Sequence, residues 1–566
     1  MPGLCGYAFF SQGRSADRAA LERMRHALAC RPYHCSDPVF VDGPFGAART
    51  HPGIIQNSRQ PFSRGGIHVW LDGEFYDADT RPDAERTDPE ILCANYAAGN
   101  LIPFLRTVDG IFSAVIYDAG QQTLRLLCDR YGLCALYVGL TSAGLFWASE
   151  LKAFRHAPRF PMTISKECVA EFMRTGHCMG AATWFSGVEL LDPATVICLD
   201  LRTSRLERVR YWHWSDLPPC VAPRDLDETA RKLGECFRRA VVRRCRRGER
   251  IGVGLSGGLD SRAIFAALPP FVEPVEAYTF GKRECADIRI AQQVAALRPS
   301  RQRICHIDPD DWLDRRVEGV WRTDGQFNLL HLHGAGCAEE HRDFFDIRLN
   351  GFLGDALLGG AYGGHPGGEI ERFRNRGRRF IALGYSWGNF ACHTRIPFFD
   401  NELLELTLSI PWSFRRNSSM YRRMLLATFP EYFSSIPWQK TGLPISKIGA
   451  VATLHGIARR AVRKIGGFLP FIQAADGYAE YSAWLRRPHA RGFLDRLLGH
   501  RDALLFEFVD PRAIELRLCQ HDAGFDCADA LGRYLTFELW LRQFFQNEFM
   551  DFSAEGVRRS LSQLDE

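Results

Sequence analysis

Several features that would assign this chain of 566 residues to a membrane or a secretory class are missing. No run of about 18 uncharged apolar residues occurs, so we predict no membrane span and no membrane partner. The first residues, Met1-Pro2-Gly3-Leu4-Cys5, lack the basic and apolar stretches of a signal peptide. We therefore expect a cytoplasmic protein.

A strong charge of one sign is also missing. The chain has 71 basic and 66 acidic residues, and a net charge of +5 is too small on this length to indicate a nucleic-acid partner. Only seven of the basic residues are lysine, so each lysine can be weighed separately. With 46% hydrophobic and 24% charged residues, the composition is that of a globular protein.

The 18 cysteines include no Cys-x-x-Cys pair. The tightest spacings, Cys30 with Cys35 and Cys128 with Cys134, are wider than those of most zinc sites. In a cytosolic chain we expect most of these cysteines to be buried thiols that pack as small hydrophobic side chains.

Residues 1–214 read as short strands rich in Val, Ile, Phe and Tyr between Gly and Asp turns, a pattern typical of antiparallel sheets. The predicted strands are Ile67–Leu71, Phe112–Tyr117, Leu124–Cys128, Ala135–Leu140 and Leu145–Ala148, and the predicted helix is Asp88–Ala98. The polar, proline-bearing residues 215–225 predict a linker.

Residues 226–566 alternate between predicted helices and strands, which indicates a doubly wound parallel sheet. The predicted helices are Leu226–Cys245, Arg262–Leu268 and Asp287–Leu297, and the predicted strands are Ile251–Leu255, Glu276–Phe280, Arg303–Ile307 and Asp346–Leu349. The Gly- and Arg-rich segment Ala361–Arg379 predicts a mobile loop, and the last hundred residues are expected to be mainly helical.

The most informative segment is Ser256-Gly257-Gly258-Leu259-Asp260-Ser261, which follows an apolar strand and opens a helix. Glycines allow close backbone approach, and a helix start offers unpaired N–H groups to an anion. The serines add hydroxyl donors, and Asp260 adds a carboxylate suited to Mg²⁺. The segment fits neither the Walker nor the Rossmann pattern. It resembles the S-G-G-x-D-S loop of enzymes that cleave ATP to AMP and pyrophosphate; the alternative is an ordinary glycine turn.

Further segments resemble the asparagine synthetases. Asn350 to Gly360 is similar to their G-x-G-x-D-E-x-F-G-G segment, Arg395–Asp400 to R-V-P-F-L-D, and Lys440-Thr441-Gly442 to their lysine segment. Leu71–Tyr76 and Asp129–Tyr137 resemble segments of their glutaminase domain. The resemblance covers nearly the whole chain and implies an α/β protein. It implies an N-terminal nucleophile hydrolase-like sandwich domain (1–214), a linker (215–225) and a doubly wound parallel-sheet ATP pyrophosphatase, or synthetase, domain with a helical C-terminal part (226–566).

The site expected from this resemblance uses ATP and Mg²⁺. Asp260 and Asp355 both follow strands, so both can reach one crevice and share Mg²⁺ with pyrophosphate. The resemblance implies catalytic roles for these two aspartates and for Lys440, whose charge would act on the phosphates or on a tetrahedral intermediate. It implies nucleotide contacts from Leu255, Ser256, Gly257, Gly258, Leu259, Asp260, Ser261, Phe280, Asn350 and Gly351. The alternatives are a helix cap for Asp355 and a solvated surface lysine for Lys440; Arg395 and Asp400 are expected to be structural.

The first departure from the asparagine synthetases lies in the glutaminase-like domain. That domain needs cysteine at its mature N-terminus, whereas Cys5 lies four residues in and removal of Met1 would expose Pro2. Asp72 replaces an asparagine and cannot donate the same hydrogen bond while ionised. Although Asp88 matches the glutamine-binding aspartate, we predict an inactive domain in which Cys5 is an unreactive thiol; a chain cleaved to begin at Cys5 would reverse this.

The second departure is that Phe352 and Ala356 stand where asparagine synthetases have glutamates. Ammonia is mostly protonated at neutral pH and benefits from a base, whereas a peptide α-amine, with a pKa of about 7.7–8.0, is partly neutral. In this the chain resembles the lasso peptide cyclases, which use ATP to close a macrolactam between the N-terminal amine and an Asp or Glu side chain. That resemblance implies a ribosomal precursor peptide as substrate and a leader peptidase as partner. The alternatives are a glutamine- or ammonia-dependent amidotransferase such as asparagine synthetase, a β-lactam synthetase-like enzyme, or a nucleotide-binding scaffold.

Overall fold

The computed structural model describes residues 2–10, 13–76, 86–364, 368–447 and 477–564. The chain forms two compact units: Met1–Leu217 with Ile370–His393, and Pro218–Glu369 with Thr394–Glu566. The chain therefore leaves the second unit at Ile370 and returns to it at Thr394. The sequence-based boundaries had assigned all of 226–566 to one domain.

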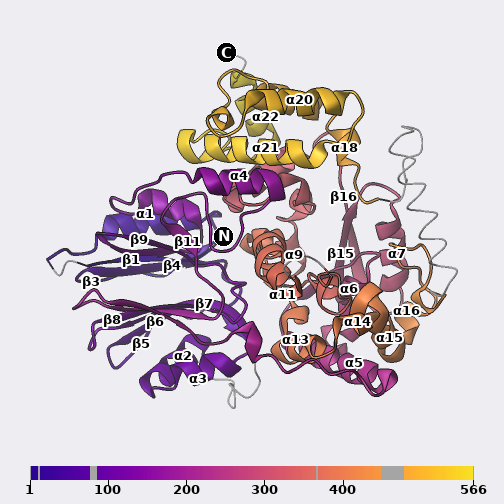
Figure 1. The fold of residues 1–566 in the computed structure, drawn as a ribbon, viewed down its shortest axis with the longest axis horizontal. Helices are drawn as coiled ribbons and strands as arrows, with labels where there is room; N and C mark the ends of the chain where they lie inside the picture. Colours follow the sequence, from indigo (N-terminus) through magenta and orange to yellow (C-terminus); the bar gives the residue numbers. More distant parts are fainter. Residues whose placement is uncertain (1, 11–12, 77–85, 365–367, 448–476, 565–566) are drawn as a thin grey trace. The chain divides into compact units, whose positions relative to one another are not determined.

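The first unit is built from two antiparallel sheets, shown stacked in Figure 1. One has the order β11-β9-β10-β1-β4-β2, with β3 paired to β4, and the other has the order β13-β12-β8-β7-β6-β5. Their strands are β1 Gly3–Phe9, β2 Cys35–Ser36, β3 Phe40–Asp42, β4 Phe45–His51, β5 Phe62–Arg64, β6 Ile67–Phe75, β7 Gly110–Asp118, β8 Thr123–Cys128, β9 Tyr137–Thr141, β10 Gly144–Ala148, β11 Val188–Leu190, β12 Thr195–Asp200 and β13 Leu206–Arg210. The five strands predicted in this region are thereby confirmed.

Helices cover both outer faces of this sandwich (Figure 1): α1 (Arg18–Leu28) lies on the sheet of β1 and β4, and α2 (Asp88–Ala97) with α3 (Leu101–Thr107) lies on the sheet of β6. Between the sheets, side chains such as Phe45, Trp70 and Trp147 form one buried core. Other helices of the unit include η2 Leu151–His156, α4 Lys166–Thr175, η3 Trp214–Asp216, α12 Ala382–Ser386 and η8 Trp387–Phe390. The expected N-terminal nucleophile hydrolase-like sandwich is confirmed.

The prediction of a mobile loop over Ala361–Arg379 is wrong for its helical part. Gly368–Arg372 forms helix α11, and Phe373–Ile381 forms the π-helix η7; 365–367 lie outside the described residues. Arg378 is buried and donates through Nε to the carbonyl of Gly132 at 2.8 Å. Arg379 is 1% exposed and donates to two further backbone carbonyls. These backbone carbonyls satisfy the guanidiniums, so arginine-rich sequence can be buried here.

The second unit contains a five-stranded sheet in the order β16-β15-β14-β17-β18. The strands are β14 Ile251–Gly254, β15 Val275–Gly281, β16 Ser300–His306, β17 Ile347–Leu349 and β18 His393–Arg395, and β14 pairs in parallel with both β15 and β17. The chain moves outward from β14 through β15 to β16 and then returns to β17 on the other side of β14. The strand order thus reverses between β14 and β17, and ligands of open α/β sheets bind beyond the carboxyl ends of strands at such a point.

Helices connect and flank these strands, as the alternating pattern predicted. They are α5 Leu226–Val242, α6 Leu259–Ala267, η4 Pro270–Val272, α7 Ala286–Ala295, α8 Asp314–Arg322, η5 Leu329–His331, η6 Ala335–Cys337, α9 His341–Phe344, α10 Gly354–Leu357, η9 Pro397–Phe399, α13 Asn401–Leu408, α14 Trp412–Arg415, η10 Arg416–Ser418, α15 Ser419–Thr428, α16 Pro430–Phe433 and η11 Ile445–Lys447. Helix α6 begins at an N-cap glycine, Gly258, with no side-chain cap. Its first N–H groups are therefore open to a ligand.

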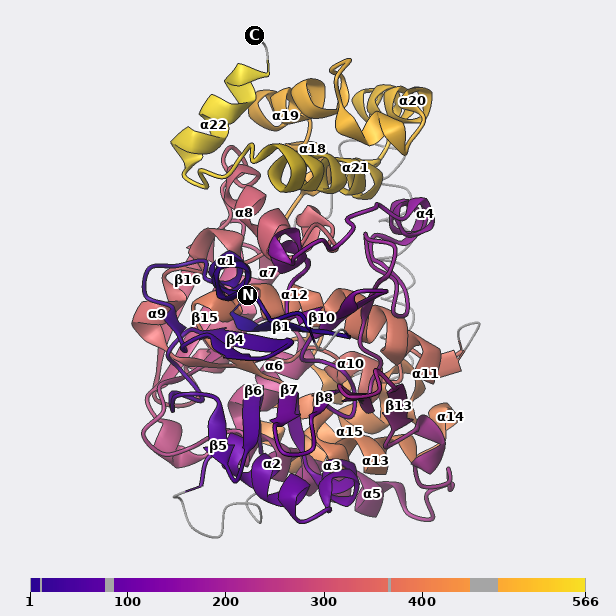
Figure 2. The same ribbon diagram turned by 90° about the vertical axis from the view of Figure 1, so that its left-hand side faces the viewer.

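The C-terminal part is helical, as predicted. It comprises α18 Tyr481–Trp484, α19 Pro488–Leu498, η12 Leu504–Glu507, α20 Pro511–Asp522, α21 Ala528–Leu541, η13 Arg542–Gln546 and α22 Ala554–Gln563. Figure 2 shows these helices gathered at one end of the second unit, where α21 and α22 contact α8. Among the described residues, none of the helices has the length and apolar character needed to cross a bilayer. Eleven of the 18 cysteines are buried, which agrees with the prediction for most of them.

Two residues expected to be structural, Arg395 and Asp400, fasten β18 and α13 to the end of α5. Arg395 donates to the carbonyl of Arg244 at 2.8 Å and forms a two-pronged ion pair with Glu249. Asp400 accepts from Arg244 at 2.9 Å and caps α13 by accepting from Leu403 N at 3.1 Å. The side chains of Arg244 and Asp400 are 0% and 1% exposed.

We predict that Asp400→Ala lowers the free energy of unfolding of the second unit by about 3–5 kcal/mol, because it removes the carboxylate that compensates the buried charge of Arg244. Arg423→Ala is the matched control, since it removes a solvent-exposed ion pair with Asp227 and should cost less than about 1 kcal/mol. Urea unfolding followed by circular dichroism measures both. Equal losses in the two variants would contradict the assignment.

Candidate active site

The loop between β14 and α6 packs so closely against other segments that it requires glycine. Leu255 N donates to the carbonyl of Tyr278 at 2.8 Å, and its own carbonyl accepts from Thr279 Oγ1 at 2.9 Å. A Cβ on Gly257 would lie 2.7 Å from Cβ of Gln439. A side chain at Gly257 would therefore push the segment of Gln439 away from the loop.

Two side chains and one backbone N–H group hold the N–H and the carbonyl of Gly257. Its N–H donates to Asp287 Oδ1 at 2.9 Å. Its carbonyl accepts from Arg262 Nη2 and from the backbone N–H of Gln439, each at 3.1 Å. Because the carbonyl oxygen of Gly257 accepts these two hydrogen bonds, its negative charge points away from an anion bound at the start of α6.

The two serines of the loop bond to each other. Ser256 Oγ lies 2.9 Å from Ser261 Oγ, and Ser261 Oγ accepts from Ser256 N at 3.0 Å. Ser256 Oγ also accepts from Gly258 N at 3.2 Å. These contacts close the loop on itself, so the two hydroxyls, which the sequence predicted as donors to an anion, bond within the loop in this structure.

Asp260 and Asp355 are brought together at the point where the strand order reverses. Asp260 Oδ2 accepts from the backbone N–H of Asp355 at 3.0 Å, and Oδ1 accepts from Tyr421 Oη at 2.9 Å. The fit is close, because a Cβ on Gly354 would lie 2.5 Å from Cγ of Asp260. Asp355 itself is exposed.

The electrostatics of this pair favour a cation. Burial, followed by the charge of Asp355, raises the pKa of Asp260 from 3.8 to about 8; Tyr421 and Lys440 act in the opposite direction. A carboxylate whose ionisation is disfavoured in this way, beside a second carboxylate that is open to solvent, offers oxygen donors that suit a hard divalent cation such as Mg²⁺. The residues therefore fit the predicted metal.

Lys440 lies on a tight turn docked against this loop. Trp438 O accepts from Gly442 N at 2.7 Å, and Gly442 adopts φ +75°. The side chain of Lys440 is exposed, its Nζ lies 5.3 Å from the ring centroid of Trp438, and its charge acts on the pKa of Asp260. The turn thus places the charge of the predicted lysine within electrostatic range of Asp260.

The other predicted nucleotide contacts differ in accessibility. Asn350 Oδ1 accepts from Phe352 N at 3.1 Å, which shapes the turn after β17, and Gly351 lies against the start of α6. The side chains of Leu255 and Leu259 are only 1% and 5% exposed, so the structure does not present them on the open side of the loop. In the turn from Asn350, Phe352 is half-buried and Ala356 is buried.

Phe280, at the end of β15, lines a pocket of about 290 Å³ together with His333 and Trp312. His333 is held by Tyr481 Oη at 2.9 Å on Nδ1 and by Tyr478 Oη at 3.1 Å on Nε2. Burial lowers the pKa of His333 well below its ordinary value, so the ring is neutral. One wall of the pocket is therefore a neutral imidazole in a fixed orientation.

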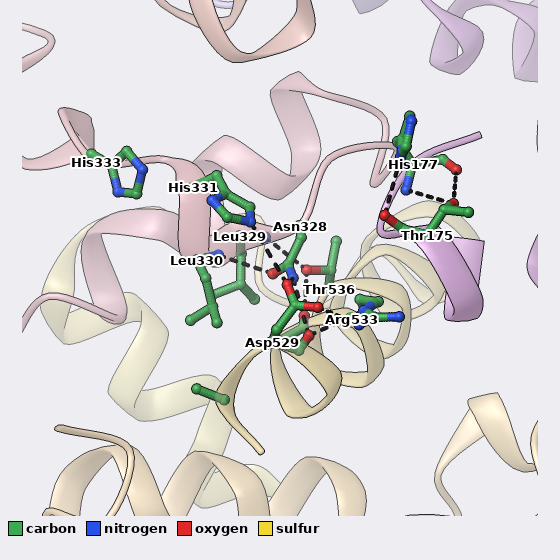
Figure 3. A network of polar contacts seen from close by, with 12 residues as sticks. Thr175, His177, Asn328, Leu329, Leu330, His331, His333, Asp529, Arg533 and Thr536 are labelled. Carbon is green, nitrogen blue, oxygen red and sulfur yellow. Dashed lines mark hydrogen bonds and ion pairs between the residues drawn. The ribbon is translucent and has the colours of Figure 1, made fainter. Parts of the chain in front are cut away.

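The segment that carries His333 is fastened by the C-terminal helix α21, as Figure 3 shows. Asn328 Nδ2 donates to the carbonyl and to Oδ1 of Asp529, both at 3.1 Å. Leu329 N donates to Thr536 Oγ1 at 2.9 Å. Helix α21 thus supports this pocket, although it lies some 200 residues further along the chain.

Sequence reasoning missed Arg262, Asp287, Gln439 and Tyr421. Arg262 directly follows the loop's last serine, and Asp287 is an acid in a predicted helix with an otherwise apolar face, so each carried a local signal. Tyr421 carried none, because its partner Asp260 is 161 residues away.

In the first unit, the residues that correspond to glutaminase positions are buried or bonded to other residues of the same unit. Cys5 is 0% exposed inside β1, and burial raises the pKa of its thiol to about 12. The buried Asp88 accepts from Gln56 Nε2 at 2.5 Å and from Phe75 N at 3.0 Å. Asp72 lies 3.6 Å from Cys134 Sγ, and burial raises the pKa of its carboxyl.

Comparison with known proteins finds two families that match successive parts of the chain. Residues 1–212 match the glutamine amidotransferase domain family, and residues 232–380 match the asparagine synthase family. Together the two matches support an asparagine synthetase-like protein, with an amidotransferase domain preceding a synthase domain.

Individual relatives cover the chain to different extents. The chain is 31% identical over 226 residues to amidase chry2 of Gibberella zeae (37% of this chain, 32% of the relative). It is 27% identical over 299 residues to asparagine synthetase [glutamine-hydrolyzing] 2 of Bacillus subtilis (47% and 39%) and 23% identical over 437 residues to asparagine synthetase [glutamine-hydrolyzing] 3 of the same organism (68% of each). The chain thus spans less than half the length of the first two relatives.

We predict that Asp260→Asn stabilises the protein when no metal or nucleotide is present. Since the pKa of Asp260 is raised to about 8, ionisation of this group opposes folding above the ordinary value of 3.8 and does so fully only above about pH 8. Asparagine can retain both contacts without the charge, because its Oδ1 can accept from Asp355 N while its Nδ2 donates to Tyr421 Oη. The melting temperature of the variant should exceed that of the wild type by about 3 °C at alkaline pH, and the difference should shrink as the pH falls.

Asp495→Asn, which changes an exposed carboxylate on α19, is the control and should show no such trend. Scanning calorimetry from about pH 5 to about pH 9 decides the matter. A difference between Asp260→Asn and wild type that is the same at every pH would mean that Asp260 ionises normally.

Proposed function

We propose that this protein uses ATP to activate a carboxylate as an acyl-adenylate and then transfers the acyl group to an amine, forming an amide bond with release of AMP and pyrophosphate. The observation that carries this proposal is the meeting of Asp260 and Asp355 at the reversal of strand order, beside the uncapped start of α6. The choice of ATP as the nucleotide rests on the resemblance of the loop to that of ATP pyrophosphatases.

In the first step, a substrate carboxylate oxygen attacks the α-phosphorus of ATP, and the bond to the β-phosphate oxygen breaks. The open N–H groups at the start of α6 bind the leaving pyrophosphate, and the ammonium of Lys440 opposes the charge that develops on the phosphates. Asp260 and Asp355 would hold Mg²⁺, which would supply further neutralisation of that charge. In the second step, the amine nitrogen attacks the acyl carbon, loses a proton, and AMP departs.

The finer proposal is that both reacting groups belong to one ribosomal precursor peptide, in which a lasso-type macrolactam closes between the α-amine and an Asp or Glu side chain. Two features support it: Phe352 and Ala356 replace glutamates in the turn beside Asp355, and the thiol of Cys5 is buried. An aromatic side chain there offers packing to a peptide rather than a base for an ammonium ion. A leader peptidase that exposes the α-amine is the partner that this reaction needs.

A second candidate is a glutamine- or ammonia-dependent amidotransferase that makes asparagine or a related amide. The match of residues 1–212 to the glutamine amidotransferase domain family favours it, as does the presence of Asp88, the counterpart of the glutamine-binding aspartate. The two candidates share the adenylation step and differ in the amine.

We predict that ATP is converted to AMP and pyrophosphate in a reaction that requires Mg²⁺. Asp260→Ala and Asp355→Ala should each lower turnover by about 100-fold or more, because the charge that develops on the phosphates is then less neutralised. Asp495→Ala, in the exposed carboxylate on α19, should leave turnover unchanged. Formation of ADP and phosphate instead would remove the adenylation mechanism.

The assay pairs each nucleotide measurement with mass spectrometry of the acceptor. Candidate precursor peptides should lose one water, about 18 Da, and acetylation of the peptide's N-terminus, or an acceptor changed to Asn or Gln, should prevent the loss. Aspartate with ammonium or glutamine is the competing substrate set. Asparagine formation without any dehydrated peptide would overturn the cyclase proposal and leave the adenylation proposal standing.

We predict that Cys5 does not act as a nucleophile. Because the pKa of its buried thiol is about 12, iodoacetamide at mildly alkaline pH should label the exposed Cys35, Cys220 and Cys519 but not Cys5 in the native protein. Purified protein should release no ammonia from glutamine, and Cys5→Ala should retain synthetase activity within about 2-fold. Glutamine hydrolysis that disappears in Cys5→Ala would restore the amidotransferase reading.

A further inference from the structure

Arg262 connects the phosphate loop to the segment that leads to Lys440. The residue lies in the first turns of α6, and its side chain is 0% exposed. Nη2 donates to the carbonyl of Gly257 at 3.1 Å and to that of Pro437 at 2.7 Å. Nη1 donates to the carbonyl of Ile436 at 3.2 Å.

The carbonyls on the far side of this guanidinium belong to the chain just before the lysine turn. Ile436 and Pro437 follow α16 and run directly into Trp438, Gln439 and Lys440. The backbone N–H of Gln439 then bonds to the same Gly257 carbonyl that Arg262 holds. The loop and the lysine turn therefore meet at one carbonyl oxygen, and Arg262 spans the junction.

Arginine suits this position better than lysine. Its planar fork reaches carbonyls on two segments at once, and its geometry is largely pre-organised. Burial lowers the pKa of Arg262 to about 10, so the group stays charged at neutral pH. A buried cation behind the loop also draws the Gly257 carbonyl inward, which leaves the N–H groups at the start of α6 to face the phosphates.

We propose that Arg262 is a positioning residue that sets the distance between the ammonium of Lys440 and the phosphate loop. The inference rests on the proposed function, because it gives Lys440 a task on the nucleotide phosphates. It adds that the task depends on a side chain that itself touches neither substrate nor metal. Loosening this junction moves Lys440 without removing its charge.

The first test is kinetic. Arg262→Lys should lower kcat for AMP formation by about 10-fold with little change in KM for ATP, since small displacements of a charged group weaken transition-state stabilisation more than binding. In a Lys440→Ala background the same substitution should cost less than about 2-fold, because the group being positioned is gone. Effects that multiply in the double variant would overturn the proposal.

A matched control is Arg298→Lys, which changes a guanidinium that bonds the carbonyls of Phe265 and Leu268 at the other end of α6. It should leave kcat unchanged. Gly257→Ala approaches the junction from the other side, because its Cβ would press on Gln439, and should reproduce the kcat loss with Arg262 intact. If Gly257→Ala leaves kcat at the wild-type value, the distance between loop and turn does not matter and the proposal fails.

The second test needs no turnover. Hydrogen–deuterium exchange of a peptide covering 438–442 should be faster in Arg262→Lys than in wild type and in Arg298→Lys. Unchanged exchange would refute the positioning role even if AMP and pyrophosphate are formed. Faster exchange in a protein that makes no AMP would uphold the junction while the proposed function fails.

Discussion

The fixation of the two peptide groups that flank Gly257 is the constraint on which the rest of the candidate site depends. Its N–H is held by Asp287 and its carbonyl by Arg262 and Gln439. With both groups committed to the protein interior, the loop can present the unpaired N–H groups of α6 to an anion. The same contacts bring together three segments that are distant in sequence: the start of α6, the start of α7 and the turn of Lys440.

Charge is distributed around this fixed loop in a way that suits a reaction of phosphates. Burial and the charge of Asp355 raise the pKa of Asp260, Lys440 acts in the opposite direction, and Arg262 donates to the carbonyl of Gly257. Under the proposed function, a divalent cation and a polyphosphate together would complete this site. Stability has thus been given up locally for a geometry that fits a charged ligand, as is common at functional sites.

Much of this could be read from the sequence, because the informative patterns are local. The glycines and serines of the loop, the alternation of strands and helices, and the aspartates after β14 and β17 all lie within short windows. What could not be read depends on distant partners: Asp287 bonds a residue 30 positions away, and Tyr421 bonds one 161 positions away. Ala361–Arg379 was misjudged for the same reason, since the carbonyl that receives Arg378 Nε lies 246 residues earlier. The burial of Leu255 likewise depends on packing against distant residues, which the loop motif does not reveal.

The way in which the chain divides between its two units has a consequence for synthesis on the ribosome. The first unit includes Ile370–His393, so a nascent chain that has emerged only as far as Leu217 lacks the arginines that occupy carbonyls of that unit. The strands β14 to β17 leave the exit tunnel before those arginines do. At about 5–20 residues per second, the first unit waits roughly 10–35 seconds for its last segment. During that interval the sandwich exposes backbone carbonyls that bond Arg378 and Arg379 in the complete unit, so the first unit cannot finish folding before a large part of the second has been synthesised.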